Sequence, residues 1–191
     1  MVAETAVACG YTDVAFLDAT FPERRKNGAW AIVGLAGAKT DAVLFCAIGK
    51  NSVRAHLFST LSLDRAPVLV HPAASVSPSA RLGAGTLVVA GAIVNADAQM
   101  GCGVILNTGC SIDHDCILDD FVHVSPGARL AGNVRVGARS WIGIGAIVRE
   151  GVTIGEDVLV AAGAAVVKDL PNGARVGGVP ARPLNCKDKT C

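Results

Sequence analysis

Aromatic side chains are scarce in this sequence. Its 191 residues include five Phe, two Trp and one Tyr, although 51% of the residues are hydrophobic and 22 are Gly. A core built from small aliphatic side chains with so few rings must be narrow. The apolar content excludes intrinsic disorder, and the lack of a three-residue glycine period excludes a collagen helix.

The chain also lacks a charge imbalance, a long apolar run and paired cysteines. Lys and Arg number 17 and Asp and Glu 16, a formal net charge of +1, which gives no electrostatic reason to expect binding to nucleic acid or to an anionic membrane. No apolar stretch approaches ~18 residues and the first residues have no basic start, so neither a membrane span nor a secretion signal is predicted. Seven cysteines without close pairs indicate reduced thiols in a cytoplasmic protein.

A six-residue repeat is the strongest signal in the chain. Sixteen positions, taken every six residues from Val76 to Val166, are all aliphatic or Met. The position two residues before each of them is always small or β-branched, and the position three residues after it is Gly, Asp or Asn in thirteen of the sixteen repeats. These last residue types tolerate the left-handed backbone conformation found in turns.

This pattern predicts a parallel β-helix. Alternate residues on a short strand point to the same side, so the aliphatic position and the small position before it both face inward, and the turn residue follows. Three six-residue units close a triangular coil of 18 residues, and identical positions then stack from coil to coil. We expect about five coils within residues 71–172, with Cys110 and Cys116 as inert filler of inward positions.

The flanking segments follow other patterns. Residues 14–17 are predicted as a short buried strand, 42–47 form a second apolar run, and 68–70 form a last short strand. Helices are expected over residues 1–9 and 51–63, the second capped by Asn51 or Ser52. Strands alternating with helices favour a parallel α/β sheet in residues 1–70. Residues 173–191 are expected to form a Gly- and Pro-rich loop and tail.

Several motifs together resemble a known family. The motifs are the segments Phe16-Leu17-Asp18, Ala47-Ile48-Gly49-Lys50-Asn51, Ile105-Leu106-Asn107-Thr108, Ile112-Asp113-His114-Asp115-Cys116, Val122-His123-Val124-Ser125, Ala131-Gly132-Asn133-Val134 and Gly178-Val179-Pro180-Ala181-Arg182. The sequence resembles the bacterial left-handed β-helix acetyltransferases that acetylate nucleotide-linked amino sugars, together with the sialic acid O-acetyltransferases. Within that group it is most similar to the UDP-4-amino-sugar and GDP-perosamine N-acetyltransferases.

The resemblance implies a mainly β fold: a left-handed parallel β-helix preceded by a small Rossmann-like α/β domain. It implies an acetyl-CoA-dependent enzyme, without a metal, that acts on the amino group of a nucleotide-linked 4-amino sugar. It also implies a homotrimer with sites between neighbouring helices. Sugar O-acetylation, of the sialic acid type, is the alternative reaction.

Two departures from the family concern the nucleotide-sugar side. In the family, a first β-strand and a Gly-rich turn containing a histidine precede the helix that here begins at Met1. A start assigned too late, a truncation or a rebuilt pocket would each account for this difference. The family also often has a second acidic residue after the equivalent of Asp18, where this chain has Ala19.

His114 is the candidate general base. It follows the inward Ile112 by two residues, which places it at an outward-facing corner of a coil, and the same corner of the next coil is Gly132. The missing side chain leaves space beside the imidazole for an acyl group or a pantetheine arm. By resemblance His114 takes the proton of the acceptor and Asp115 modulates it. The alternative interpretation is a solvated corner histidine between two acids.

Other residues are assigned by resemblance. His123, Ile144 and Ala162 correspond to acetyl-CoA contacts, the latter two through their backbone, and Asn107 corresponds to an acceptor-site Asn. Trp141 lies one coil beyond His123, so the two rings should stack, where Trp141 would line the CoA channel or pack against another subunit. His123 is otherwise an ordinary surface residue of a strand.

Asp18, Lys50 and Asn51 match the nucleotide-sugar pocket of the family. Asp18 ends a predicted strand, where α/β folds place ligands. The alternative is an ordinary strand-end acid and a helix cap.

Two other functional classes use a similar β-helix. The γ-type carbonic anhydrases bind zinc with three histidines, since catalytic zinc needs three protein ligands and a water. The predicted β-helix offers only His114 and His123, so we expect no metal. A catalytically inactive scaffold is the other alternative, and the adjacent His114 and Asp115 argue against it.

Overall fold

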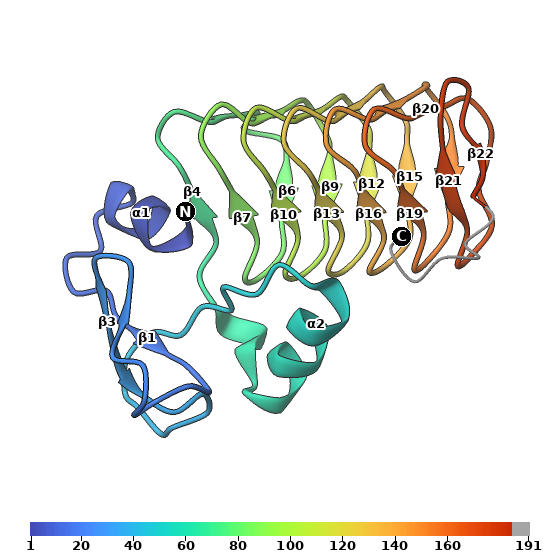
Figure 1. Ribbon diagram of the computed structural model, residues 1–191. Helices are drawn as coiled ribbons and strands as arrows, with labels where there is room; N and C mark the ends of the chain where they lie inside the picture. Colours follow the sequence, from blue (N-terminus) through green and yellow to red (C-terminus); the bar gives the residue numbers. More distant parts are fainter. Residues whose placement is uncertain (185–191) are drawn as a thin grey trace.

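The computed structural model describes residues 1–184, and most of its strands form one parallel β-helix with three faces (Figure 1). The first sheet holds β4 (Leu69–Val70), β7 (Leu87–Val88), β10 (Ile105–Leu106), β13 (His123–Val124), β16 (Trp141–Ile142), β19 (Leu159–Val160), β21 (Arg175–Gly177) and β22 (Arg182–Pro183). The second holds β5 (Ser75–Val76), β8 (Ile93–Val94), β11 (Ser111–Ile112), β14 (Arg129–Leu130), β17 (Ile147–Val148) and β20 (Ala165–Val166). The third holds β6 (Arg81–Leu82), β9 (Gln99–Met100), β12 (Ile117–Leu118), β15 (Arg135–Val136) and β18 (Thr153–Ile154).

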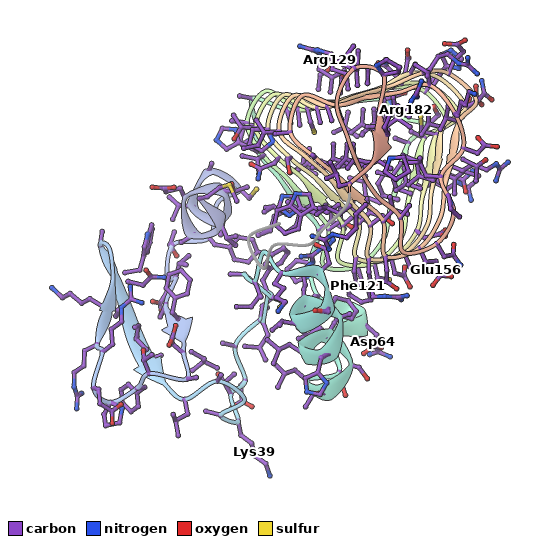
Figure 2. All side chains as sticks on the ribbon, turned by 45° about the vertical axis from the view of Figure 1, so that its right-hand side comes forward. Lys39, Asp64, Phe121, Arg129, Glu156 and Arg182 are labelled. Carbon is purple, nitrogen blue, oxygen red and sulfur yellow. The ribbon has the colours of Figure 1, made fainter. Side chains whose placement is uncertain are left out.

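The register of the sheets confirms the predicted coil. Ile105 pairs with His123, and His123 pairs with Trp141, so equivalent positions stack after each 18-residue coil. The three sheets contain eight, six and five strands, which agrees with the expected number of about five coils. Figure 2 shows the three-sided cross-section of the β-helix.

The core is the thin apolar interior that the repeat predicts. Val124, Ile142 and Val160 are completely buried at successive inward positions. Cys110 and Cys116 fill inward positions as expected, and burial raises the pKa of the Cys110 thiol to about 12. The thiols in this core are therefore protonated and unreactive at neutral pH.

In two turns the left-handed conformation falls on a residue type outside the predicted Gly, Asp and Asn. Positive φ occurs at many Gly, Asp and Asn residues of the turns, but also at Phe121 and Arg139, with φ of 60° and 59°. Neither residue type favours this conformation. Both lie on the corner where the third sheet turns into the first, and this corner carries the helix α2.

The N-terminal region combines helices and strands as expected, but its sheet is not fully parallel. The helix α1 (Val2–Ala8) confirms the first predicted helix. β1 (Phe16–Leu17) pairs in parallel with β3 (Trp30–Gly34), whereas β2 (Lys26–Asn27) pairs antiparallel with β3. The β2–β3 hairpin was not predicted because this segment has no clear apolar alternation, and residues 42–47 form no strand.

The second helix is shorter than predicted and differs at its cap. α2 spans Asn51–Thr60 and is followed by a 3₁₀ turn, Leu63–Arg65. Its N-cap is Lys50, without a side-chain cap hydrogen bond, so the prediction of Asn51 or Ser52 as the cap is wrong. The Asn51 side-chain amide instead donates to the Arg139 and Ser140 carbonyl oxygens at 2.8 and 3.1 Å.

The two ends of the β-helix are covered differently. At the start, Val2, Ala6, Cys9 and Phe45 pack on the outer face of the first sheet, beside Leu69 and Leu87, with α1 next to β4 in Figure 1. At the far end, residues 173–183 are not the simple loop expected, because β21 extends the first sheet and β22 pairs antiparallel with it. Cys186 and Cys191 lie outside the described residues. The domain limits at residues 70 and 172 remain a prediction.

Candidate active site

His114 lies on the corner between the second and third sheets, in the turn from β11 to β12. Its Nδ1 is 2.8 Å from Oδ2 of Asp115, and both side chains are about half exposed. Asp115 has a φ of 57°, and this left-handed conformation folds its carboxylate back onto the neighbouring ring. The local turn therefore creates the His–Asp pair.

The backbone of His114 is fixed on both sides. Its N–H donates to Oδ1 of Asp113 at 2.8 Å, and Asp113 in turn accepts from Nδ2 of Asn95 at 2.9 Å. Its carbonyl accepts from the Asn133 N–H at 2.9 Å, one coil further on. The ring thus projects from a rigid corner, which suits a catalytic group.

Gly132 leaves the space that the sequence predicted. A Cβ atom at this position would stand 2.6 Å from Cε1 and 2.7 Å from Nε2 of His114. The glycine backbone does not need a positive φ, since Gly132 is not among the positive-φ residues. Its role is to leave room beside the ring.

The Asp115 carboxylate raises the pKa of His114 above its ordinary value through their hydrogen bond. Because the carboxylate holds Nδ1 as its donor, Nε2 is the nitrogen left free to accept a proton. A half-exposed imidazole with a raised pKa is a stronger base than an isolated histidine.

His123 has the opposite environment. It is 7% exposed on the outer face of the first sheet, and its ring stacks on Trp141 with centroids 4.6 Å apart, as the one-coil spacing predicted. Nε2 lies 3.3 Å from Nδ2 of Asn107. Burial, with the nearby positive charge of Arg54, lowers the pKa of His123 to about 4.

The two histidines therefore have different protonation states available to them. At neutral pH His123 is a neutral imidazole, whereas His114 can take up a proton. Environments that push two titratable groups apart in this way indicate which group performs acid–base work. The roles of His114 as the base and of His123 as a ligand contact therefore remain predictions that these environments allow.

The predicted residues do not meet within one chain. His123 lies on the first sheet, whereas His114 lies on the corner between the other two sheets, on the opposite side of the three-sided coil. Asn107 lies on the His123 side. Ile144 and Ala162 stack on the corner between the first and second sheets, where Ile144 is 61% exposed and the Gly163 N–H donates to the Ile144 carbonyl at 2.8 Å.

The predicted nucleotide-sugar residues belong to the N-terminal region. Asp18 directly follows β1 and accepts from the Thr20 N–H and hydroxyl at 2.9 and 2.7 Å, and these bonds lower the pKa of its carboxyl. Lys50 is exposed immediately before α2, whereas Asn51 is 5% exposed. The amide of Asn51 is thus engaged with the β-helix backbone, and its predicted contact with a substrate remains a prediction.

Two family models match parts of this chain. Residues 1–61 match the PglD N-terminal domain, and residues 133–168 match the bacterial transferase hexapeptide (six repeats). The structure is similar to the acetyltransferase domain of PglB from Neisseria gonorrhoeae in complex with acetyl coenzyme A, with 41% identity and a TM-score of 0.90, over 96% of this chain and 92% of that one. It is also similar to PerB from Caulobacter crescentus in complex with CoA and GDP-perosamine, with 40% identity and a TM-score of 0.89, over 96% and 91% of the two chains.

The chain belongs to the hexapeptide-repeat sugar acetyltransferases. A curated relative outside the sugar enzymes, a 2,3,4,5-tetrahydropyridine-2,6-dicarboxylate N-acetyltransferase from Staphylococcus aureus, is 42% identical over 71 residues. That match covers 33% of this chain and 30% of the relative, so the chain spans less than a third of the length of such curated relatives.

Two features of this acetyltransferase were missed in the sequence. Trp141 donates from Nε1 to the Ser125 hydroxyl at 2.7 Å. This bond fixes the indole ring on which His123 stacks. Arg54 is 1% exposed and contacts both α2 and the β-helix. Arg54 lies on the same buried face of α2 as Asn51 and Phe58, but the mixed polar sequence of this helix gave no sign of which face is buried.

No helix within residues 1–184 is long and apolar enough to cross a membrane. In the same part of the chain, no three His, Cys, Asp or Glu side chains are grouped so that they could hold a metal ion.

Proposed function

We propose that this protein transfers the acetyl group of acetyl-CoA to the amino group of a nucleotide-linked 4-amino sugar, with His114 as the general base. The observation that carries the proposal is the exposed His114–Asp115 pair, 2.8 Å apart, facing the gap left by Gly132. A base of raised pKa beside an unfilled space suits removal of a proton from an amine that attacks a thioester.

The chemistry follows from this geometry. The amine nitrogen forms a bond to the acetyl carbon, its proton passes to Nε2 of His114, and the C–S bond breaks so that CoA leaves as the thiol after protonation. Asp115 stabilises the imidazolium that forms during the reaction. The only cysteines of the β-helix with inward side chains in this region, Cys110 and Cys116, are buried, so we infer direct attack without an acetyl-enzyme.

The acetyl-CoA site is proposed on the side of the chain that carries His123. Within residues 1–184 the backbone N–H groups of Ile144 and Ala162 donate no hydrogen bond, and both residues are exposed. Two such donors on one corner fit the amide groups of a pantetheine arm. His123, neutral and held against Trp141, would contact the acetyl end together with Asn107.

The separation of His114 from His123 supports a homotrimer. The base on one corner of a protomer needs the His123 side of a second protomer to complete the site, and closed rings of such contacts are ordinary in homo-oligomers. The structures of relatives in complex with acetyl coenzyme A, or with CoA and GDP-perosamine, support the same pair of ligands here. Sedimentation should report roughly three times 19.4 kDa, and an active monomer would contradict the shared site.

The acceptor is proposed to contact Asp18 and Lys50 of the N-terminal region, with Asn51 beside them. The hydrogen bonds from Thr20 lower the pKa of the Asp18 carboxyl further below neutral pH, and the carboxylate would accept hydrogen bonds from sugar or ribose hydroxyls. The five described cysteines are unpaired, which supports the prediction of a cytoplasmic enzyme.

The decisive experiment is an acetyl-transfer assay with UDP- and GDP-linked 4-amino sugars, and with a sugar that offers only hydroxyl groups. We expect transfer to the amine and a decrease in kcat of ~10²–10⁴-fold in His114→Ala, the usual loss for a positioned base. The exposed His56→Ala is the matched control and should be fully active. Transfer to hydroxyls alone, or full activity of His114→Ala, would refute the proposal.

A further inference from the structure

Arg54 is a buried cation whose guanidinium contacts only neutral oxygen atoms. It is 1% exposed, and its Nε donates to the Gly103 carbonyl at 2.7 Å. Nη1 donates to the carbonyls of Ile48 and Gly49 at 3.0 Å each, and Nη2 donates to the Phe121 carbonyl at 2.7 Å and to Oδ1 of Asn51 at 2.9 Å. All five donors are thus used, yet no carboxylate among residues 1–184 forms an ion pair with it.

Burial of a charge without a counter-charge is expensive, so this arrangement calls for a reason beyond packing. Burial lowers the pKa of Arg54 to about 10, and the side chain therefore remains charged at neutral pH. An apolar residue could fill the same space at a lower desolvation cost. What the guanidinium adds is a rigid fork that ties several backbone segments together.

The helix α2 follows the corner between the third and first sheets. Asn51 bonds to the Arg139 carbonyl, Arg54 bonds to the Phe121 and Gly103 carbonyls, and Phe58 packs edge-on against Phe121, with ring centroids 5.3 Å apart. Positions 103, 121 and 139 occupy the same place in successive coils. A helical turn rises by about 5.4 Å and a coil by about 4.8 Å, so side chains from successive turns of α2 reach neighbouring coils along this corner. Figure 2 shows Phe121 beside α2.

This docking also explains the two turn exceptions. Phe121 and Arg139 adopt a positive φ on the corner where α2 lies. The Phe121 ring contacts Phe58, and the carbonyls of both residues accept from α2 side chains. At Gly85, on the same corner, an added Cβ would stand 2.6 Å from the ring of Phe58. The corner is therefore shaped for α2.

The segments that Arg54 joins meet at His123. Phe121, whose carbonyl accepts from Nη2, precedes His123 by two residues, and the Gly49 carbonyl accepts from Nη1. The Gly49 backbone lies near His123 and offsets part of the lowering of the pKa of His123. The Nδ1 atom of His123 is buried and has no hydrogen-bond partner among the described residues. Asn107 and Trp141 contact the rest of the ring.

We propose that Arg54 is a positioning residue of the acetyl-transfer site: by tying Ile48 and Gly49 to the turns at 103 and 121, it holds His123 buried and stacked on Trp141. This inference rests on the proposed function, in which His123 contacts acetyl-CoA. Arg54 itself does not touch the reacting atoms. Its effect reaches the ligand through the position and the charge state of His123.

The test compares Arg54→Lys and Arg54→Met with the wild type in two measurements. The first is an NMR titration of the His123 ring in the protein without substrate, and the second is the KM for acetyl-CoA beside kcat. Phe58→Leu is the docking control, because it weakens the packing of α2 and leaves every hydrogen bond of Arg54 in place. The exposed Arg65→Met is the control for loss of a positive charge near α2.

We expect His123 to titrate at least about one pKa unit higher in Arg54→Met, since both burial and the adjacent charge are reduced. In Arg54→Lys we expect KM for acetyl-CoA to rise about tenfold with kcat changed by less than about threefold, the pattern of lost binding rather than lost chemistry. Neither control should show these changes, even if Phe58→Leu melts at a lower temperature.

A merely structural Arg54 would lower the melting temperature and leave the His123 titration and KM unchanged, and this result would overturn the proposal. If Arg54→Met does not fold, Arg54→Lys and the titration of the wild type still test the proposal. A wild-type His123 that titrates at ~6.5, the ordinary value for histidine, also overturns the proposal. The titration needs no substrate. A protein that shows the shift but transfers no acetyl group therefore retains the link from Arg54 to His123 and contradicts only the proposed function.

Discussion

Gly132→Ala tests whether the space beside His114 is the acetyl-transfer site. The new Cβ would lie 2.6 Å from Cε1, 2.7 Å from Nε2 and 3.2 Å from Nδ1 of His114, all closer than an ordinary van der Waals contact of about 3.5–4.0 Å. The backbone of Gly132 needs no positive φ, so alanine itself is not strained. The clash must be relieved by the imidazole, which is half exposed and can move only by straining its hydrogen bond to Asp115.

A ring displaced by about 1 Å leaves the position where it can reach the attacking amine and also lengthens its bond to Asp115. Misplacement of this size typically costs ~10²-fold in rate, and we expect a decrease in kcat of that order. The melting temperature should change little, because the three atoms nearest to the added Cβ all belong to the half-exposed ring of His114. Steady-state acetyl transfer and a thermal melt measure the two effects separately.

The control is the same substitution in a His114→Ala background. Without the imidazole there is no clash, so Gly132→Ala should cause no further loss of activity in that background, and the double-mutant cycle should show strong coupling. Equal losses in both backgrounds would show that Gly132 acts by another route. Wild-type activity of Gly132→Ala alone would refute the proposed location of the acyl group.

Two further substitutions test the charge states of the histidines. Asp115→Asn weakens the hydrogen bond that raises the pKa of His114. Because the rate falls when pH drops through this pKa and the base becomes protonated, the acidic limb of kcat/KM should move to lower pH. A limb that does not move would contradict the role of Asp115. Trp141→Ala exposes the ring of His123. The pKa of His123, about 4 in the wild type, should therefore rise toward ~6.5 in an NMR titration. An unchanged titration would show that burial by Trp141 does not cause the low pKa.

The β-helix could be predicted from the sequence because every coil obeys the same local rule. The period of six fixes which side chains face inward, and the coil of 18 fixes which residues stack, including His123 on Trp141 and Gly132 beside His114. Repeat folds depend on contacts between neighbouring coils, so errors at one position do not propagate.

Both helices and the first strand of the N-terminal region could be predicted, but its contacts with the β-helix could not, because they are not periodic. Asn51 was expected to cap α2 or bind substrate, but its amide bonds to Arg139 and Ser140, which lie almost ninety residues away in the chain. Arg54 is buried for a similar reason, through carbonyls at 103 and 121. Tertiary contacts of this kind override local preferences, and a single sequence carries no trace of them.

The position of His114 also shows how this fold can accept chemistry without loss of its framework. At this corner each outward-facing residue is followed by a residue whose backbone N–H donates a hydrogen bond to the preceding coil. Asp115, which follows His114, donates in this way to the Ala96 carbonyl at 3.0 Å. The outward side chain itself takes no part in this ladder, and it is Ala96, His114, Gly132 and Glu150 in successive coils. Function can therefore be placed on a corner independently of the fold. The proposed site requires only that this corner carry a histidine side chain at position 114 and no side chain at position 132 of the next coil.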